Sequence, residues 1–131
     1  MTTVPVGIGI TRIGQIAINV KDSERATAFY RDVLGLPLLF QAGALSFFNC
    51  GGVRLMLSLA EKPDFDHPSS ILYFNVPDIT AAHNKLRDAG ARMEGEPHLI
   101  AKMPDHDLWM TFFYDSEDNF LGLMSEVKRA S

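Results

Sequence analysis

The chain has 131 residues, of which 47% are hydrophobic and 21% charged, and its formal net charge is −4. This size and composition are typical of a soluble globular protein, so we expect a single domain over residues 1–131. The acidic balance argues against nucleic acid as a partner, and no segment has the roughly 20 apolar residues of a membrane-spanning helix. Because Cys50 is the only cysteine, no intramolecular disulfide can form, and a reducing, cytoplasmic setting is expected.

Residues 10–60 predict a strand, a helix and three further strands. The strand comes first, because apolar and polar side chains alternate over 14–20 and successive side chains of a strand point to opposite faces. One face carries Ile16, Ile18 and Val20, and the other carries Gln15, Ala17 and Asn19. A helix then begins at Asp22 or Ser23, whose side chain can accept its free N–H groups. The three remaining β-like runs cover 37–42, 45–50 and 53–59.

A connector at 61–69, rich in proline and aspartate, leads to a second unit at 70–126 that repeats this order. Its helix follows Asp78, and its later strands are expected at 92–102, 108–114 and 120–125. Six residues of the first unit recur 56 positions later without a gap: Asn19, Val20, Asp22, Ala26, Arg31 and Asp32. A fixed offset indicates two copies of one supersecondary unit. The sequence therefore predicts an α+β fold made of two βαβββ modules.

Both predicted helices are amphipathic. The apolar stripe of the first has the spacing i, i+3, i+4, i+7 and i+8, and consists of Ala26, Phe29, Tyr30, Val33 and Leu34. The stripe of the second consists of Ile79, Ala82 and Leu86. Gly35 and Gly90 follow the two helices, where a residue in the left-handed conformation is expected. We therefore expect each helix to pack its stripe against the sheet of its own module.

Two stretches resemble the vicinal oxygen chelate superfamily, which contains glyoxalases, epimerases, bleomycin-resistance proteins and extradiol dioxygenases. VKDSERATAFYRDVLGL (20–36) is similar to the superfamily's first-module signature, and FFYDSEDNFLGL (112–123) is similar to its strand–turn–strand ending. With the internal repeat, the resemblance covers residues 12–126. It implies curved mixed sheets with helices on their convex sides, a small-molecule pocket on the concave side, and a homodimer. It also implies that Gln15 and Tyr73 face the pocket.

Enzymes of this superfamily commonly hold a divalent metal with His, Gln or Glu side chains from the first and last strands of each module. The equivalent positions in this chain are Gln15, Met56, Ile71 and Gly122. Among them only Gln15 offers an oxygen ligand, whereas a stable site needs three or four ligands. The sequence therefore predicts no cofactor and no metal at the usual position.

The histidines leave a displaced metal as an alternative. We expect His67, in the connector, and His83, on the second helix, to be exposed to solvent. His98 and His106 lie in a predicted hairpin with an acidic turn, and pairing of its strands would make them near neighbours. Both are candidates for acid–base catalysis or metal binding, because the pKa of histidine lies near neutral pH.

Other residues are candidates for ligand contacts. Trp109 either fills the core or a dimer interface, or forms an aromatic wall for a planar ligand. The same two interpretations apply to Tyr73, Phe48, Met56 and Met124. Arg54 shares a strand face with Met56, and its guanidinium either points into the concave pocket, where it would favour a carboxylate or phosphate, or lies in solvent at the rim.

The first hypothesis is a metal-free homodimer that binds a small hydrophobic or aromatic molecule in its concave pocket. Its expected ligand contacts are Gln15, Arg54, Met56, Tyr73, His98, His106 and Trp109. The alternative is a glyoxalase-, epimerase- or dioxygenase-like enzyme that uses a displaced metal or acid–base chemistry at His98 or His106. A third possibility is a catalytically inert partner of another subunit.

Overall fold

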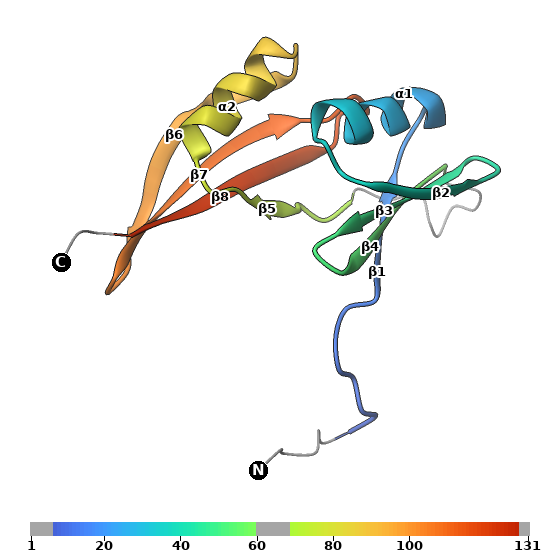
Figure 1. The fold of residues 1–131 in the computed structure, drawn as a ribbon, viewed down its shortest axis with the longest axis horizontal. Coiled ribbons are helices and arrows are strands. Elements are labelled where there is room, and N and C mark those ends of the chain that lie inside the picture. The colour runs from blue at the N-terminus through green and yellow to red at the C-terminus, as the bar shows by residue number, and fades with distance from the viewer. Residues whose placement is uncertain (1–6, 60–68, 129–131) are drawn as a thin grey trace.

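The computed structural model describes residues 7–59 and 69–128, which form two four-stranded sheets (Figure 1). The first sheet has the strand order β1-β4-β3-β2, and its strands are β1 (Gln15–Asn19), β2 (Leu38–Ala42), β3 (Leu45–Cys50) and β4 (Val53–Ser58). The second has the equivalent order β5-β8-β7-β6, with β5 (Tyr73–Asn75), β6 (Arg92–Lys102), β7 (His106–Tyr114) and β8 (Phe120–Lys128). In each sheet the first strand pairs in parallel with the last, and the other pairs are antiparallel. The predicted α+β fold is confirmed.

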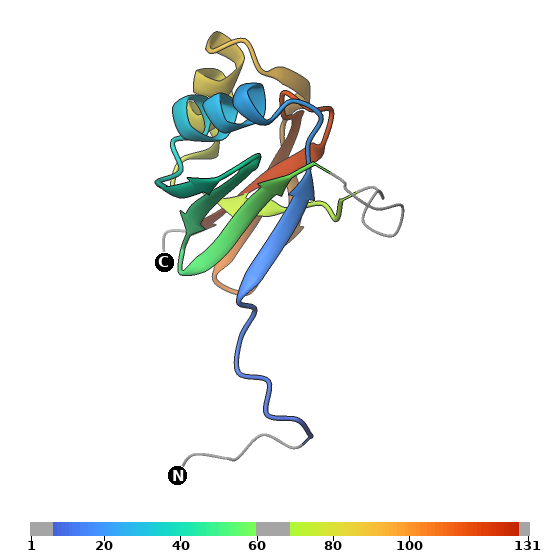
Figure 2. The ribbon, with the colours of Figure 1, turned by 90° about the vertical axis from the view of Figure 1, so that its right-hand side faces the viewer.

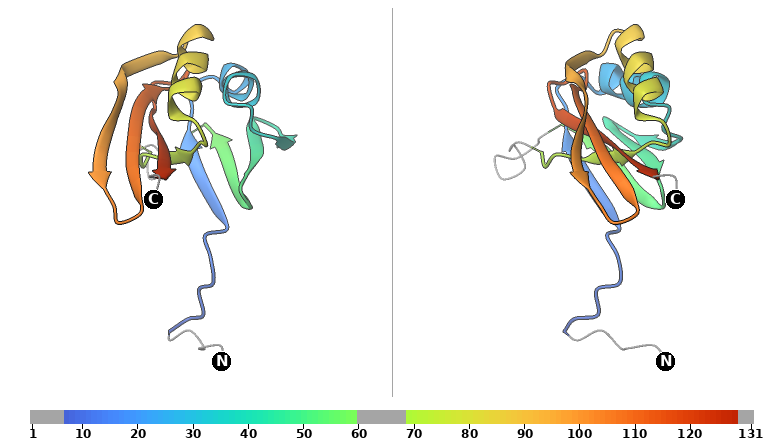
Figure 3. Two further views of the ribbon diagram at one scale, coloured as in Figure 1. Left: turned by 60° about the vertical axis from the view of Figure 1, so that its left-hand side comes forward. Right: turned by 90° about the vertical axis from the view of Figure 1, so that its left-hand side faces the viewer.

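The helices follow the first strand of each sheet and lie next to each other at one end of the molecule (Figures 2 and 3). They are α1 (Ser23–Ala28), which continues into the π-helical turn η1 (Phe29–Val33), and α2 (Ile79–Asp88). Asp22 caps α1 by accepting from the N–H of Arg25 at 3.0 Å, and Asp78 caps α2 in the same way. The sequence predicts Asp78 for the second helix and offers Asp22 or Ser23 for the first, and Asp22 is the one that caps it. Among the helices of residues 7–59 and 69–128, none is long and apolar enough to cross a bilayer.

The first helix differs from the regular α-helix that its spacing predicts. The N–H of Leu34 bonds to the carbonyl of Phe29 at 3.0 Å, five residues back, which is the pattern of a π turn. Tyr30 still faces the core, where its hydroxyl donates to the carboxylate of Asp115 at 2.6 Å. Burial, followed by the charge of Asp115, raises the pKa of the Tyr30 phenol far above its ordinary value. The π turn thus contains Tyr30, which forms a buried hydrogen bond to Asp115 of the second module.

One hydrophobic core joins both modules on the helix-facing sides of the sheets. Ile18 on β1 is 1% exposed, whereas its neighbour Ala17 lies on the exposed side of the strand. The core consists of Ile18, Val20, Ala26, Tyr30, Phe48, Leu55, Leu57, Ile79, Leu86, Phe113, Leu121 and Leu123. It thus contains part of each predicted helix stripe, and the other stripe residues are partly buried against it: Phe29, Val33, Leu34 and Ala82. Because both helices bury their stripes here, the opposite face of each sheet carries no helix; we call it the open face.

The turn at 115–119 connects the second module to the start of α1. The side chain of Glu117 is fully buried, and its carboxylate accepts from the N–H groups of Lys21 and Asp22, each at 2.8 Å. Arg25 donates to the same carboxylate at 2.7 and 3.1 Å. Asn119 donates to the carbonyl of Asn19 at 3.0 Å. These bonds join segments more than 90 residues apart, and they hold the two modules in one arrangement.

Candidate functional site

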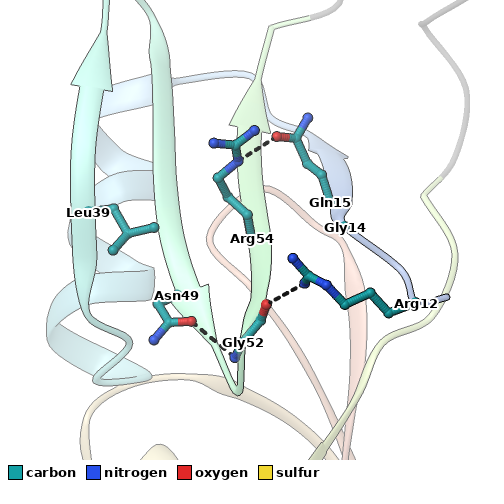
Figure 4. Close-up of a pocket in the computed structure, with 7 residues that line it drawn as sticks. All are labelled: Arg12, Gly14, Gln15, Leu39, Asn49, Gly52 and Arg54. Atoms are coloured by element: carbon teal, nitrogen blue, oxygen red, sulfur yellow. Dashed lines mark hydrogen bonds between the residues drawn. The ribbon is translucent and has the colours of Figure 1, made fainter.

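A hollow of about 530 Å³ lies on the open face of the first sheet (Figure 4). It is lined by Arg12, Gly14, Gln15, Leu39, Asn49, Gly52 and Arg54. The sequence singles out Gln15 and Arg54 from this set. The strand pairing brings them together, because β1 and β4 run in parallel with Gln15 opposite Arg54, and Asn49 on β3 is opposite Arg54 from the other side.

Hydrogen bonds hold the polar side chains of the hollow. Arg54 Nε donates to Gln15 Oε1 at 2.8 Å, and the amide nitrogen of Gln15 faces the sulfur of Met56 at 3.7 Å. Arg12 donates to the carbonyl of Gly52 at 3.1 Å, and the N–H of Gly52 donates to Asn49 Oδ1 at the same distance. Figure 4 shows Arg54 and Gln15 at one end of the hollow, with Gly52 at the other. The two arginines therefore enter the hollow from different segments.

The charge of this hollow is positive. Its lining contains two guanidinium groups and two amide side chains, and no carboxylate belongs to the lining residues. Within the part of the chain that the structure describes, neither Arg12 nor Arg54 forms an ion pair. A cationic patch on a chain of net charge −4 favours an anionic group locally.

An apolar row lies next to Arg54 on the same face; it consists of Phe40, Phe47 and Met56. The rings of Phe40 and Phe47 stack with centroids 4.4 Å apart, and the guanidinium carbon of Arg54 lies 5.3 Å from the centroid of Phe47. Phe40 is 47% exposed and presents aromatic surface to solvent, whereas Phe47 is only 8% exposed. Sequence reasoning missed Phe47, because two adjacent phenylalanines occur on β3 and only the pairing with β4 assigns their faces. The other one, Phe48, is fully buried in the core.

The open face of the second sheet is aromatic. Phe112 forms an edge-to-face contact with Tyr73 at 5.9 Å and stacks on Phe120 at 5.2 Å, and its centroid is 6.4 Å from that of His98. Gly122 lies beneath Tyr73, where an added Cβ would come within 2.8 Å of the tyrosine ring. The structure thus brings Tyr73 and His98 onto one aromatic surface, separate from the strands that carry the hollow.

Trp109 lies away from both open faces. It shares the helix-facing side of β7 with Thr111 and Phe113, which are fully buried, and it packs against the core. The alternation along β7 separates Trp109 from Phe112, but it does not tell which of the two faces the helix. Only the position of α2 decides that choice.

The histidines are arranged differently from the predictions. His83 was expected in solvent but is 2% exposed, so this prediction is wrong. Its ring bonds Thr111 Oγ1 at 3.2 Å and lies 3.1 Å from the carboxylate of Glu96, because strands β6 and β7 cover that side of α2. His67 lies outside the described residues.

His98 and His106 are not neighbours. His98 is opposite Met110 on β7, four residues from His106, which corresponds to roughly 13 Å along the strand. His106 is near the end of the hairpin, where its Nδ1 lies 2.6 Å from a carboxylate oxygen of Asp105 and its Nε2 lies 3.9 Å from Glu126. Over residues 7–59 and 69–128, no group of three or more His, Cys, Asp or Glu side chains is placed to hold a metal ion.

A second, apolar groove of about 430 Å³ lies between the modules. It runs past the end of the first helix and along β5, and its lining includes Leu34, Leu36, Cys50, Phe74 and Leu123. Burial raises the pKa of the Cys50 thiol above its ordinary value, so this cysteine is not activated as a nucleophile. The groove therefore offers an apolar surface without a reactive group.

Comparison of the sequence with known protein families identifies the class of protein that has this fold. Residues 12–121 match the family described as Glyoxalase/Bleomycin resistance protein/Dioxygenase superfamily. The chain belongs to this superfamily, which confirms the resemblance seen in the sequence. It is 26% identical over 117 residues to YraH, an uncharacterised protein of Bacillus subtilis (strain 168), with 72% of this chain and 91% of that protein covered.

Solved structures of the superfamily share the fold. A member from Sphaerobacter thermophilus DSM 20745 has a TM-score of 0.74 at 21% identity, covering 89% of this chain and 98% of its own. TnmS3, an antibiotic binding protein from Streptomyces sp. CB03234, has a TM-score of 0.71 at 23% identity, covering 92% of this chain and 99% of its own. A lactoylglutathione lyase from Agrobacterium tumefaciens has a TM-score of 0.66 at 21% identity, covering 88% and 94%. Both a binding protein and an enzyme thus have this fold.

Proposed function

We propose that the protein binds a small hydrophobic or aromatic molecule on its open faces, without the metal ion commonly used in its superfamily. The observation that carries this proposal is the bond from Arg54 Nε to Gln15 Oε1 at 2.8 Å. That oxygen is the only oxygen donor among the side chains at the four positions equivalent to the superfamily's ligands. A guanidinium bonded to it repels a divalent cation and occupies one of the two lone pairs of this oxygen.

The other equivalent positions also do not fit a hard divalent metal. Met56 offers a thioether, Ile71 a hydrocarbon side chain, and Gly122 no side chain at all under the ring of Tyr73. Instead, the two faces offer aromatic contacts, which is what a protein needs for binding without catalysis. TnmS3, a structural neighbour, is an antibiotic binding protein, which supports a binding role on this scaffold.

We place the ligand contacts at Gln15, Arg54 and Met56 on the first sheet and at Tyr73 and His98 on the second. We also propose that the chain forms a homodimer in a reducing, cytoplasmic setting. Large apolar side chains outside the proposed ligand contacts support the dimer, since they are strongly exposed in a single chain: Ile10 at 73%, Ile13 at 62%, Ile71 at 44% and Val127 at 44%.

One observation favours the alternative, an enzyme that uses acid–base chemistry. The short contact between His106 and Asp105 can orient the imidazole for proton transfer. This pair lies at the hairpin end and is separate from the hollow and from the aromatic surface around Tyr73. We prefer a binding function, because it uses the hollow and the aromatic surface around Tyr73, whereas the acid–base alternative uses neither.

The proposal is tested with protein dialysed against EDTA and checked by elemental analysis. A panel of neutral and charged aromatic compounds is screened by thermal shift, and the affinities of the hits are measured by calorimetry. We expect at least one compound to stabilise the metal-free protein, because a ligand that binds only the folded state raises its stability. Binding that appears only after Ni²⁺, Zn²⁺, Fe²⁺ or Mn²⁺ is added, or no binding at all, would contradict the proposal.

A matched pair of variants locates the site. Phe40→Ala removes an exposed ring from the open face of the first sheet, and we expect it to weaken binding. Leu99→Ala is the control, because Leu99 has a similar exposure of 39% but pairs with Trp109 on the helix-facing side of β6. Equal effects of the two substitutions would argue against a site on the open face.

A further inference from the structure

We infer that the hollow recognises an oxyanion of the bound molecule, a carboxylate or a phosphate, through the guanidinium of Arg54. This inference rests on the proposed function and names the chemical class of its ligand: an apolar or aromatic body with one anionic group. The anionic group bonds the terminal nitrogens of Arg54, and the apolar body lies on the row formed by Phe40, Phe47 and Met56.

The guanidinium of Arg54 is held in place before any ligand arrives. Its Nε donates to Gln15, and its central carbon lies over the ring of Phe47, 5.3 Å from the centroid, so two contacts restrict the side chain. The two terminal nitrogens make no hydrogen bond within residues 7–59 and 69–128. They form the edge of the guanidinium that pairs with both oxygens of a carboxylate or phosphate in a planar, bidentate geometry. Prior ordering lowers the entropy cost of forming those bonds.

The surroundings favour an anion over a neutral polar group. Arg12 adds a second positive charge to the lining of the hollow, and the amides of Gln15 and Asn49 add polar groups without charge. Because the lining residues include no carboxylate, a bound anion meets no repulsion from them. The volume of about 530 Å³ lies in the range of cavities that bind small molecules. An anionic head in the hollow places the rest of the molecule next to Phe47.

The test compares naphthyl compounds of one ring size that differ in the polar group. The probes are 2-naphthoate, 2-naphthyl phosphate and the neutral 2-naphthalenemethanol, with inorganic phosphate as the anion without a ring. Affinities are measured by calorimetry on the full chain at pH 7 and low salt. We expect at least one of the two aromatic anions to bind about tenfold more tightly than the neutral alcohol, because charged hydrogen bonds are worth more than neutral ones. The tighter of the two anions identifies the oxyanion as carboxylate or phosphate.

Three variants test whether Arg54 causes the preference for the anionic ligand. Arg54→Gln should reduce the preference for the anion to less than about threefold, and a far-UV circular dichroism spectrum equal to that of the wild type shows that the variant is folded. Arg54→Lys keeps the charge but loses the planar edge, so an intermediate preference is expected. Arg87→Gln is the control, because it removes a positive charge from an exposed position on α2.

The outcomes separate this inference from the proposed function. If the alcohol and the anions bind equally well, or if Arg54→Gln keeps the full preference, the oxyanion site is refuted while small-molecule binding stands. If inorganic phosphate binds as tightly as the aromatic anions, the apolar row is not part of the site and the inference fails. If none of the naphthyl compounds binds, both the inference and the proposed function are contradicted for this ligand class.

Discussion

The carboxylate of Glu117 should be one of the largest single contributors to the stability of this protein. Burial by itself would raise its pKa, but hydrogen bonds from Arg25, from the N–H groups of Asp22 and Lys21 and from Ser116 lower the pKa from 4.5 to about 2. One pKa unit corresponds to about 1.4 kcal/mol, so the shift corresponds to about 3 kcal/mol. Because Arg25 is half exposed and its charge is screened, we expect about 2 to 3 kcal/mol in solution.

The substitution Glu117→Gln keeps the size of the side chain but replaces one acceptor oxygen with an NH₂ group that faces N–H donors. We expect it to reduce the free energy of unfolding at pH 7 by at least about 2 kcal/mol, measured by urea denaturation. Glu24→Gln is the matched control, since Glu24 is an exposed carboxylate in the first turn of the same helix. The control should change stability by less than about 0.5 kcal/mol.

The pH dependence gives a second test with a defined sign. A carboxylate whose pKa is lowered by folding stabilises the folded state above its unfolded pKa of 4.5, and this stabilisation is lost as the pH falls toward 2. The difference between wild type and Glu117→Gln should therefore be largest at pH 7 and fall by about half at pH 3. A difference that stays constant from pH 7 to pH 3, or a loss at pH 7 below about 0.5 kcal/mol, would refute the role given to this carboxylate.

Two further measurements address the fold and its assembly. His83→Leu should lower the free energy of unfolding by about 1 to 3 kcal/mol, because it leaves the hydroxyl of fully buried Thr111 without its side-chain partner. Lys85→Leu, on the exposed side of α2, is the control. A loss of equal size in both variants would contradict this role of His83. Sedimentation velocity should show a species of about twice 14.5 kDa that a charge at exposed Ile71, introduced by Ile71→Asp, converts to monomer, whereas a 14.5 kDa species at all concentrations would exclude the proposed homodimer.

Much of the fold could be predicted from local sequence patterns. Alternation with a period of two marks β1 correctly, and the capping residues Asp22 and Asp78 begin both helices, because strand period and capping depend on residues only a few positions apart. The offset of 56 positions predicts two equivalent sheets, and their strand orders are equivalent. At the candidate site, alternation along one strand predicts that Arg54 and Met56 share a face, whereas the pairing of β1 with β4 brings Gln15 beside them.

Other features depend on segments that are distant in the sequence. Glu117 lies 95 residues from Asp22, and nothing local at either position indicates that the two are bonded. Arg12 joins the hollow only because the turn at Gly52 packs beside the segment that leads into β1. Such contacts follow from how two sheets and two helices pack.

The sequence by itself determined the modules, their elements and which side chains share a face, since these follow from backbone geometry with periods of two and 3.6 residues. The tertiary structure alone decided which face is covered. The packing of α2 buries His83, and it assigns Trp109 to the core side. The pairing of β3 with β4 places Phe47 rather than Phe48 beside Arg54. The period of a strand or helix shows which side chains share a face. Only the element that packs against that face decides whether these side chains contact the core, a ligand or water.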